Sequence, residues 1–219
     1  MQSHLEQCRY NMVEQQVRPW DVLDDKVLSV IESIPRDQFV PPQYINIAYA
    51  DTAIPLNSST KMMHPIIEGR LLQLLDIQAD DEILEIGTGS GYLTACLAHM
   101  GKHVDSVEIN ETLAKQAAQK LLEQGIFNIG LSCADALEFI DTNKKYDVIV
   151  LTGSVSDTPD SLKNALAENG RMFVVNGCAP AMQAHIITRT GENDWADECV
   201  FETVLAPLVH GEKKPEFKF

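Results

Sequence analysis

The stretch Asp81-Glu-Ile-Leu-Glu-Ile-Gly-Thr-Gly-Ser-Gly-Tyr92 constrains the fold of this chain more than any other. A short apolar run of Ile83, Leu84 and Ile86 is followed at once by closely spaced glycines and then by a helical pattern from Thr94 to Met100. Such a run is typical of a buried parallel strand that enters a tight turn. Glycines at this point let backbone N–H groups approach a ligand, and the following helix N-terminus favours polar or anionic groups.

The spacing of the glycines distinguishes between ligand classes. A dinucleotide fingerprint, G-x-G-x-x-G, would require a glycine at position 92, which is Tyr92. The pattern here is G-x-G-x-G with Glu85 two residues before it, which is the pattern of nucleoside-binding methyltransferases and disfavours a dehydrogenase. Glycines also serve ordinary tight turns, so the interpretation depends on features further along the chain.

Two acids follow at the period of a strand and a helix. Glu108 lies near the end of a predicted strand at 102–109, where an acid can accept hydrogen bonds from ribose hydroxyls. Asp135 ends a short predicted strand at 130–135 and is a candidate partner of an adenine amino group. Either acid taken singly is more readily explained as a strand-end or helix-capping carboxylate. The three features in this order favour a nucleoside site.

Strands and helices alternate over the rest of the chain. Further strands are predicted at 146–151, 171–175, 183–189 and 199–205, and helices at 66–75, 111–124 and 159–167, the last with Asn169-Gly170 as its stop. Segment 190–197 is a polar hairpin-like link. The order predicts an α/β fold: a doubly wound, mostly parallel, Rossmann-like sheet with one antiparallel edge strand and its ligand at the carboxyl ends of the first strands.

The N-terminal region predicts a helical extension. Residues from about 4 to 34 are expected to be helical with a break at 18–22, and 44–50 is expected to form a short helix. We therefore expect three parts: a helical and extended segment, 1–60, packed on the catalytic domain; a ligand-binding domain, 61–210; and a loose tail, 211–219.

Composition excludes several classes of function. The net charge of −15 repels phosphate backbones and disfavours nucleic-acid binding. Neither a long apolar run nor a secretory pattern is visible, and the five cysteines are scattered, so we expect a cytoplasmic protein with reduced thiols and no disulfide framework or zinc site. The six histidines show no metal-ligand spacing. A monomer is the default expectation.

The chain resembles the protein-L-isoaspartate O-methyltransferases over nearly its whole length. The motifs that carry this resemblance are Met12-Val-Glu-Gln-Gln-Val17, Ile34-Pro-Arg-Asp-Gln-Phe-Val40, Ala48-Tyr-Ala-Asp-Thr-Ala-Ile-Pro55, Leu84-Glu-Ile-Gly-Thr-Gly-Ser-Gly-Tyr92, Ser106-Val-Glu108, Tyr146-Asp-Val-Ile-Val150 and Ala206-Pro-Leu-Val-His-Gly211. The N-terminal and C-terminal motifs are specific to this family, whereas the glycine motif marks the wider methyltransferase class.

The resemblance implies S-adenosylmethionine as the cofactor and isoaspartyl or D-aspartyl residues of damaged proteins as the substrates. The glycines would line the methionine part of the cofactor, Glu108 would hold the ribose, and Asp135 would bind the adenine. The implied cofactor-binding residues are Glu85, Gly87, Thr88, Gly89, Ser90, Gly91, Glu108, Ile109, Asp135, Ala136 and Thr152.

The chain departs from the family at the methyl-acceptor loop. The family usually has Gly-Gln-Thr-Ile-Ser-Gln-Pro, with hydroxyls at the acceptor carboxylate; this chain has Ser59-Thr-Lys-Met-Met-His-Pro65, which places Lys61 and Met63 at the Thr and Ser positions. The Gly-Asp-Gly around the adenine acid is also changed, to Ala134-Asp-Ala136. Losing a hydrogen bond to a charged acceptor costs roughly 1.5–3 kcal/mol. Because they occupy this loop, Lys61, Met63 and His64 are the candidate catalytic residues.

Several interpretations of this loop stay open. Lys61 or His64 can supply a cation, and Ser58, Ser59 or Thr60 can supply a hydroxyl if the loop is shifted. Alternatively, Lys61 is solvated and the methionines are packing residues. Met63 also suits a more apolar acceptor, which would make the chain a diverged methyltransferase, and a non-catalytic cofactor-binding homologue is a third alternative.

Overall fold

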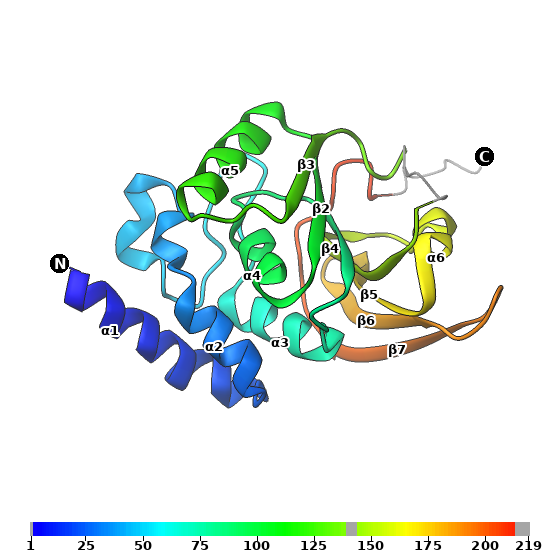
Figure 1. Cartoon of the computed structure of the whole chain (residues 1–219), viewed down its shortest axis with the longest axis horizontal. Helices are drawn as coiled ribbons and strands as arrows, with labels where there is room; N and C mark the ends of the chain where they lie inside the picture. The colour runs from blue at the N-terminus through cyan, green and yellow to red at the C-terminus, as the bar shows by residue number, and fades with distance from the viewer. Residues whose placement is uncertain (1, 139–143, 213–219) are drawn as a thin grey trace.

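The computed structural model describes residues 2–138 and 144–212 of the 219. Within these residues a central sheet has the strand order β3-β2-β1-β4-β5-β6-β7 (Figure 1). Its strands are β1 Glu82–Ile86, β2 His103–Glu108, β3 Ile129–Cys133, β4 Tyr146–Val155, β5 Leu166–Cys178, β6 Ala181–Arg189 and β7 Trp195–Glu202.

Helices surround this sheet, and some of them begin with a side-chain cap. They are α1 Gln2–Met12, η1 Val13–Val17, η2 Arg18–Trp20, α2 Asp25–Ser33, η3 Arg36–Gln38, η4 Pro42–Ile47, α3 Pro65–Leu75, α4 Tyr92–Met100, α5 Glu111–Glu123 and α6 Asp160–Ala165. The Asp24 carboxylate accepts from the Lys26 N–H at the start of α2. Asn110 caps α5 in the same way. The predicted break at 18–22 is confirmed by η2 and by the left-handed backbone of Asp21.

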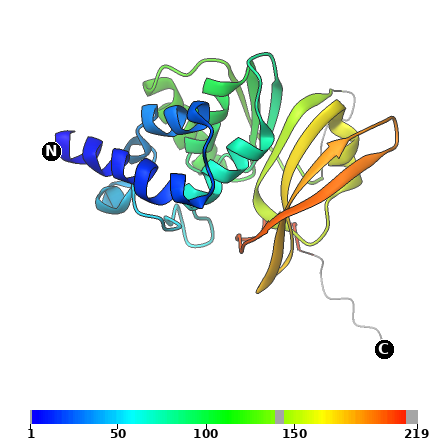
Figure 2. The same ribbon diagram turned by 90° about the horizontal axis from the view of Figure 1, so that it is seen from below.

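Alternating side chains of the central strands pack into two separate hydrophobic cores, one on each face of the sheet. Val148 and Val150 of β4 belong to the core that includes the N-terminal helices and α3, α4 and α5. Ile149 and Leu151, which point to the other face, pack with Leu162 of α6. Figure 2 shows the blue and cyan N-terminal helices gathered on one side of the sheet. Both faces of the parallel part are thus covered, as the apolar strand sequences require.

The strand order creates a crevice beside the end of β1. This strand pairs in parallel with β2 on one side and with β4 on the other. The connections therefore diverge at its carboxyl end, which is the position where open α/β sheets bind ligands. The predicted α/β class is confirmed. The antiparallel edge contains two strands, β6 and β7, where one edge strand was expected.

Some predicted boundaries are wrong near the second core. Helix α6 ends at Ala165, and Asn169-Gly170 lie inside β5, because Leu166 already pairs with Tyr146 of β4 and is fully buried. Asn169 adopts a positive φ where the register of this pairing shifts. β4 continues to Val155, beyond the predicted end at 151.

The boundaries of two other elements also differ from the prediction. β7 begins at Trp195, so the turn is confined to 190–194, where the Thr190 N–H donates to the Asp194 carbonyl oxygen. The short helix expected at 44–50 is the 3-10 helix η4, which covers 42–47.

The N-terminal segment shares the first core with the rest of the chain. Val13, Val17 and Ile31 lie in the same cluster as Leu71 and Leu93. The division of the chain at residue 60 stays a prediction, and the expected tail lies, after Glu212, outside the described residues. Across 2–138 and 144–212, the helices are too short or too polar to span a bilayer.

Candidate active site

A cavity opens at the carboxyl ends of β1, β2 and β4. Its walls come from the glycine turn, from residues 56–63, which we call the acceptor loop, and from residues 206–209, which we call the C-terminal segment. Three stretches far apart in the sequence therefore meet at the crevice that the strand order predicts.

Most of the predicted site residues line this cavity. Those that do are Lys61, Met63, Glu85, Gly87, Thr88, Gly89, Ser90, Glu108, Ile109, Asp135, Ala136 and Thr152. Gly91 and His64 are not among the lining residues. A Cβ at Gly91 would meet Ala117 of α5, because Gly91 is the left-handed residue that starts α4. His64 precedes α3, and its imidazole pairs with Asp51 at 3.5 Å.

The glycine turn brings the backbone against its neighbours more closely than a side chain would allow. Gly87 has φ +94°, and a Cβ there would lie 2.3 Å from the Thr152 hydroxyl oxygen. Gly89 has φ +54°, with Leu56 of the acceptor loop 3.3 Å from the Cβ position. Both residues need the left-handed backbone that glycine adopts without penalty. The turn is thereby open to a ligand on its cavity side.

Glu85 is a fully buried acid at the base of the cavity. Its Oε2 accepts hydrogen bonds from the Thr94 and Ser106 hydroxyls, at 2.5 and 2.6 Å. Oε1 has no partner among the described residues. Burial raises the pKa of this carboxyl to about 8, although the two hydroxyls lower it. A buried oxygen without a partner beside an open cavity can accept from a ligand donor when the carboxyl is ionised, or donate to a ligand acceptor when it is protonated.

Glu108 organises the loops on both sides of the end of β2. Its Oε2 accepts from the Gly89 N–H at 2.8 Å, and its Oε1 accepts from the Asn110 N–H at 2.9 Å. Each carboxylate oxygen can accept a second hydrogen bond. Glu108 can therefore hold the glycine turn and two vicinal hydroxyls of a ligand at the same time.

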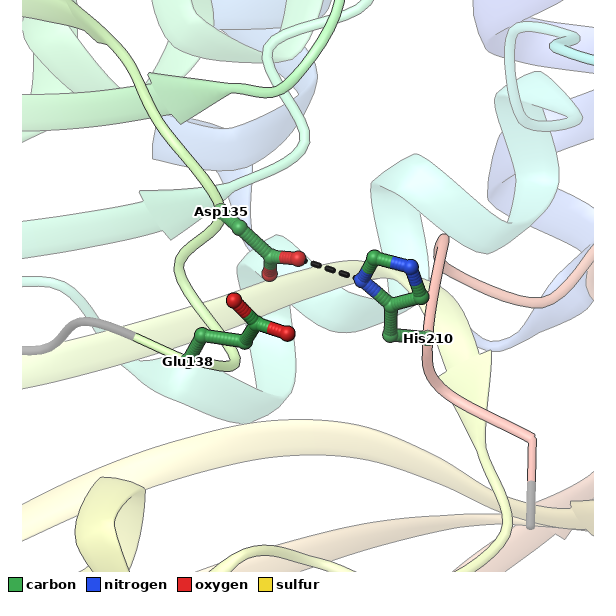
Figure 3. Close-up of side chains that lie close together, drawn as sticks. All are labelled: Asp135, Glu138 and His210. Atoms are coloured by element: carbon green, nitrogen blue, oxygen red, sulfur yellow. Dashed lines mark hydrogen bonds and ion pairs between the residues drawn. The ribbon is translucent and has the colours of Figure 1, made fainter. Parts of the chain in front are cut away.

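Asp135 lies at the other end of the cavity, where the C-terminal segment crosses it. One carboxylate oxygen accepts from the Leu137 N–H, and the other pairs with Nδ1 of His210 at 2.5 Å. Figure 3 shows the Asp135 and His210 side chains meeting from different parts of the chain, with the Glu138 carboxylate beside them. One ligand atom of each residue lies within 4.8 Å of the others. Spacing in the sequence could not show this cluster, because His210 is far from the acids along the chain.

The acceptor loop is a tight, self-capped turn. Its backbone pairs Pro55 with Lys61, and the Asn57 side-chain oxygen accepts from the Ser59 and Thr60 N–H groups and the Ser59 hydroxyl. Ser59, Thr60 and Lys61 all line the cavity. Neither the Thr60 hydroxyl nor the Lys61 ammonium has a bonding partner within 2–138 and 144–212.

Other lining residues were not identified from the sequence. Glu68 of α3 is buried in the cavity wall, and an acid on the apolar face of a predicted helix was the signal for it. The C-terminal segment was signalled by the Ala206-Pro-Leu-Val209 motif. Apolar lining by Leu56, Leu93, Val107 and Leu137 had no local signal.

The donors and acceptors of this cavity fit a cationic nucleoside. Glu85, Glu108 and Asp135 supply acceptors at separate points along it, and the exposed Ile109 side chain adds an apolar surface. The open glycine turn admits a ligand close to the backbone. S-adenosylmethionine has a sulfonium, ribose hydroxyls and an adenine amino group, which match these acceptors in kind.

Comparisons with known proteins agree with this chemistry. A family model described as Protein-L-isoaspartate(D-aspartate) O-methyltransferase matches residues 8–213. The protein-L-isoaspartate O-methyltransferase of Gloeobacter violaceus is 37% identical over 205 residues, which cover 94% of this chain and 99% of that protein. That of Aliivibrio salmonicida is 33% identical over 204 residues, covering 93% and 97%.

A solved structure supports the fold independently. A Plasmodium falciparum structure, described as a protein-L-isoaspartate O-methyltransferase in complex with S-adenosyl-L-homocysteine, superposes with a TM-score of 0.81 at 19% identity. The match covers 92% of this chain and 98% of that one. With the family model and the relatives matching nearly end to end, this chain belongs to the protein-L-isoaspartate(D-aspartate) O-methyltransferase family of S-adenosylmethionine-dependent enzymes.

Proposed function

We propose that this chain methylates the carboxylate of isoaspartyl or D-aspartyl residues in damaged proteins, and that Lys61 and Thr60 hold that carboxylate. The observation that carries the proposal is the acceptor loop, which presents an ammonium and a hydroxyl, both without partners in the described residues, to the same cavity as the glycine turn. Membership of the family supports the reaction, and the loop supports the way in which the acceptor is bound.

Methyl transfer to a carboxylate requires chiefly that the acceptor oxygen and the methyl group are aligned. S-adenosylmethionine, when bound, supplies a methyl group that is activated by a sulfonium. A carboxyl group has an ordinary pKa near about 4, so the acceptor is already ionised at neutral pH and needs no general base. Holding two reactants in line can contribute about 7–11 kcal/mol to catalysis. The task of this chain is to orient the carboxylate and to exclude water.

Lys61 and Thr60 can orient the acceptor because their backbone is fixed. The Pro55–Lys61 pairing and the Asn57 side chain hold the loop, and the Met62 N–H donates to the Ile54 carbonyl oxygen at 2.8 Å. An ammonium and a hydroxyl on adjacent residues of this loop would take the place of the paired hydroxyls of the family loop. Hydrogen bonds to a charged group contribute roughly 1.5–3 kcal/mol each.

The charge of the cavity wall is compatible with an anionic acceptor. Two acids, Glu68 and Glu85, line the cavity and would repel a carboxylate if both were ionised. Burial raises their pKa values to about 7 and about 8, which reduces their negative charge at neutral pH. The exposed ammonium of Lys61 then supplies attraction at the acceptor end.

An apolar acceptor, which Met63 suggested, has less support. Met62 and Met63 are only 5% and 7% exposed and belong to the first core. This burial supports the interpretation that both are chiefly packing residues. Ser59, Thr60 and Lys61 of the acceptor loop offer polar groups to the same cavity.

The test is methyl transfer to a matched pair of peptides. Radiolabelled S-adenosylmethionine is supplied with peptides that differ only in isoaspartate against aspartate, and base-labile methanol is counted. We expect label on the isoaspartyl peptide alone. Label on neither peptide, under conditions in which S-adenosylhomocysteine binds, would contradict the proposed acceptor. Label on both would contradict the selectivity for damaged residues.

The partners and location follow from weaker observations. We propose a monomer in the cytoplasm that acts on peptides and proteins, without nucleic-acid or membrane partners. The net charge of −15 supports the exclusion of nucleic acid. All five cysteines are free, which supports a reducing compartment. Sedimentation of the purified protein tests the oligomeric state.

A further inference from the structure

Arg36, in the 3-10 helix η3, is the largest fully buried side chain of the described residues. Its Nη1 pairs with the Glu68 carboxylate, and its Nη2 donates to the Met63 carbonyl oxygen at 2.6 Å. The guanidinium also lies over the Tyr92 ring, 4.7 Å from the ring centroid. A single side chain thus contacts the acceptor loop, helix α3 and the first residue of α4.

These contacts join the two halves of the active site. Met63 ends the acceptor loop, and Tyr92 directly follows the glycine turn. Glu68 bonds Arg36 and also lines the cavity between them. The Phe39 ring packs against Tyr92 at 5.8 Å between centroids, which holds the aromatic ring beneath the guanidinium. Any displacement of Arg36 would move the acceptor loop relative to the glycine turn.

We propose that the buried Arg36–Glu68 ion pair positions the acceptor loop of this enzyme, by fixing the loop in line with the glycine turn. The inference rests on the proposed function, because alignment matters only if a methyl group is transferred between these two parts. Both residues act through the Met63 backbone and the Tyr92 ring, so they are positioning residues rather than catalytic ones.

A purely stabilising role is a poor explanation of this pair. Taking two charges out of water costs as much as their attraction returns, so buried ion pairs are often replaced by apolar residues without loss of stability. What apolar residues cannot reproduce here is the hydrogen bond from Arg36 to the Met63 carbonyl oxygen. The Arg36 Nε has no partner in the described chain. The guanidinium is therefore placed to bond the acceptor loop, although one of its own N–H groups is left without a hydrogen bond.

The pair also predicts a signature in the pH dependence of the reaction. Burial raises the pKa of Glu68 to about 7, against the lowering effect of Arg36. As pH falls through this value, Glu68 takes up a proton and the ion pair loses one charge, so we expect kcat to fall. The titratable and charged groups that interact electrostatically with Glu68 belong to the elements around it. They are Arg36, Asp51, Glu85, Tyr92 and Cys96.

The experiment compares an apolar replacement with a matched control. The double variant Arg36→Met with Glu68→Leu removes the pair without leaving a buried charge. The control, Arg171→Met with Asp81→Leu, removes another largely buried ion pair, in which Asp81 precedes β1 at the end of the sheet opposite the cavity. Both full-length variants are measured for unfolding, for S-adenosylhomocysteine affinity and for kcat and KM on an isoaspartyl peptide.

We expect the Arg36 and Glu68 variant to stay folded and to bind S-adenosylhomocysteine, with kcat reduced roughly 10- to 100-fold because the reactants are misaligned. The control should keep its kcat. If the Arg36 and Glu68 variant keeps kcat, or if both variants lose it equally, the positioning role is wrong. If the unaltered enzyme does not methylate the peptide, the proposed function has failed instead.

A single variant keeps the test decisive if the double variant does not fold. Glu68→Gln retains the shape of the side chain and mimics the protonated acid. We expect it to lower kcat at high pH and to remove the limb of the profile near pH 7. A profile with an unchanged limb in Glu68→Gln would overturn the inference.

Discussion

The Thr152 hydroxyl donates a hydrogen bond of 2.6 Å to the carbonyl oxygen of Gly87, which ties β4 to the turn after β1. It also reaches the Ile86 carbonyl oxygen at 3.1 Å. Gly87 has φ +94°, and its missing Cβ leaves room for this hydroxyl. The glycine motif therefore serves two purposes here: it opens the turn to a ligand and lets a neighbouring strand hold the turn in place.

Substitution of this glycine should reduce cofactor binding. In Gly87→Ala the new Cβ would lie 2.3 Å from the Thr152 hydroxyl oxygen, so either the turn or β4 must shift. We expect at least a tenfold loss of S-adenosylhomocysteine affinity, measured by calorimetry, because about 1.4 kcal/mol corresponds to a factor of ten.

The control for this change is Gly125→Ala. Gly125 follows α5 with φ +73° and has no atom within 4 Å of its Cβ position. It carries the backbone penalty of about 1–2 kcal/mol without a steric clash. It should lower the free energy of unfolding and leave cofactor affinity unchanged. Equal affinities for both variants would show that the contact with Thr152 has no part in binding.

Asp135 should discriminate adenine from a base without an amino group. Asp135→Asn replaces an acceptor that the adenine amino group requires, so we expect roughly 10- to 100-fold weaker binding of S-adenosylhomocysteine, the effect of losing a charged hydrogen bond. The inosine analogue has a carbonyl in place of the amino group. Its affinity for Asp135→Asn should be little lower than its affinity for the unaltered protein, or should be higher. Parallel losses for both ligands would mean that Asp135 acts through its contact with His210 and not on the base.

Removal of the loop cation should impair acceptor binding more than cofactor binding. Lys61→Met keeps much of the side-chain length but removes the charge, and we expect KM for the isoaspartyl peptide to rise roughly tenfold or more. Thr60→Val should give a smaller rise. The matched control is Lys115→Met on α5, where the lysine pairs with Glu111 at the surface. An unchanged KM in Lys61→Met would exclude this lysine from the acceptor site.

Glu85 should make the protein less stable as pH rises. Its folded pKa is about 8 because of burial, whereas an unfolded glutamate has a pKa near about 4.3. The folded state therefore binds more protons in this window, so its stability is greatest below the unfolded pKa and is lost as pH rises through about 8.

Glu85→Gln removes this dependence because an amide does not titrate. Urea unfolding of the two proteins from about pH 5 to about pH 9 should show a shallower decline in the variant. Glu68 contributes a residual slope of the same sign, since burial raises its pKa to about 7. Identical slopes in the two proteins would mean that the Glu85 carboxyl is ionised in the folded state at neutral pH.

The sequence by itself determined the fold class and predicted which residues gather at one end of the sheet. These depend on local patterns: apolar runs of strand length, glycines at a strand end, and acids at the ends of the next strands. In a parallel sheet the carboxyl ends of neighbouring strands lie at one edge, so Glu85, Glu108 and Asp135 had to come near one another once the strands were recognised.

Only the tertiary structure decided how the acceptor end is built. The Arg36 guanidinium meets Glu68, Met63 and Tyr92, which lie 27 to 56 positions further along the chain, and His210 reaches Asp135 from 75 residues away. Gly91 and His64, which motif matching placed in the site, do not line the cavity: a Cβ at Gly91 would meet α5, and His64 pairs with Asp51, so their roles stay predictions. A motif specifies residue types along a chain, whereas the direction of each side chain depends on what packs around it.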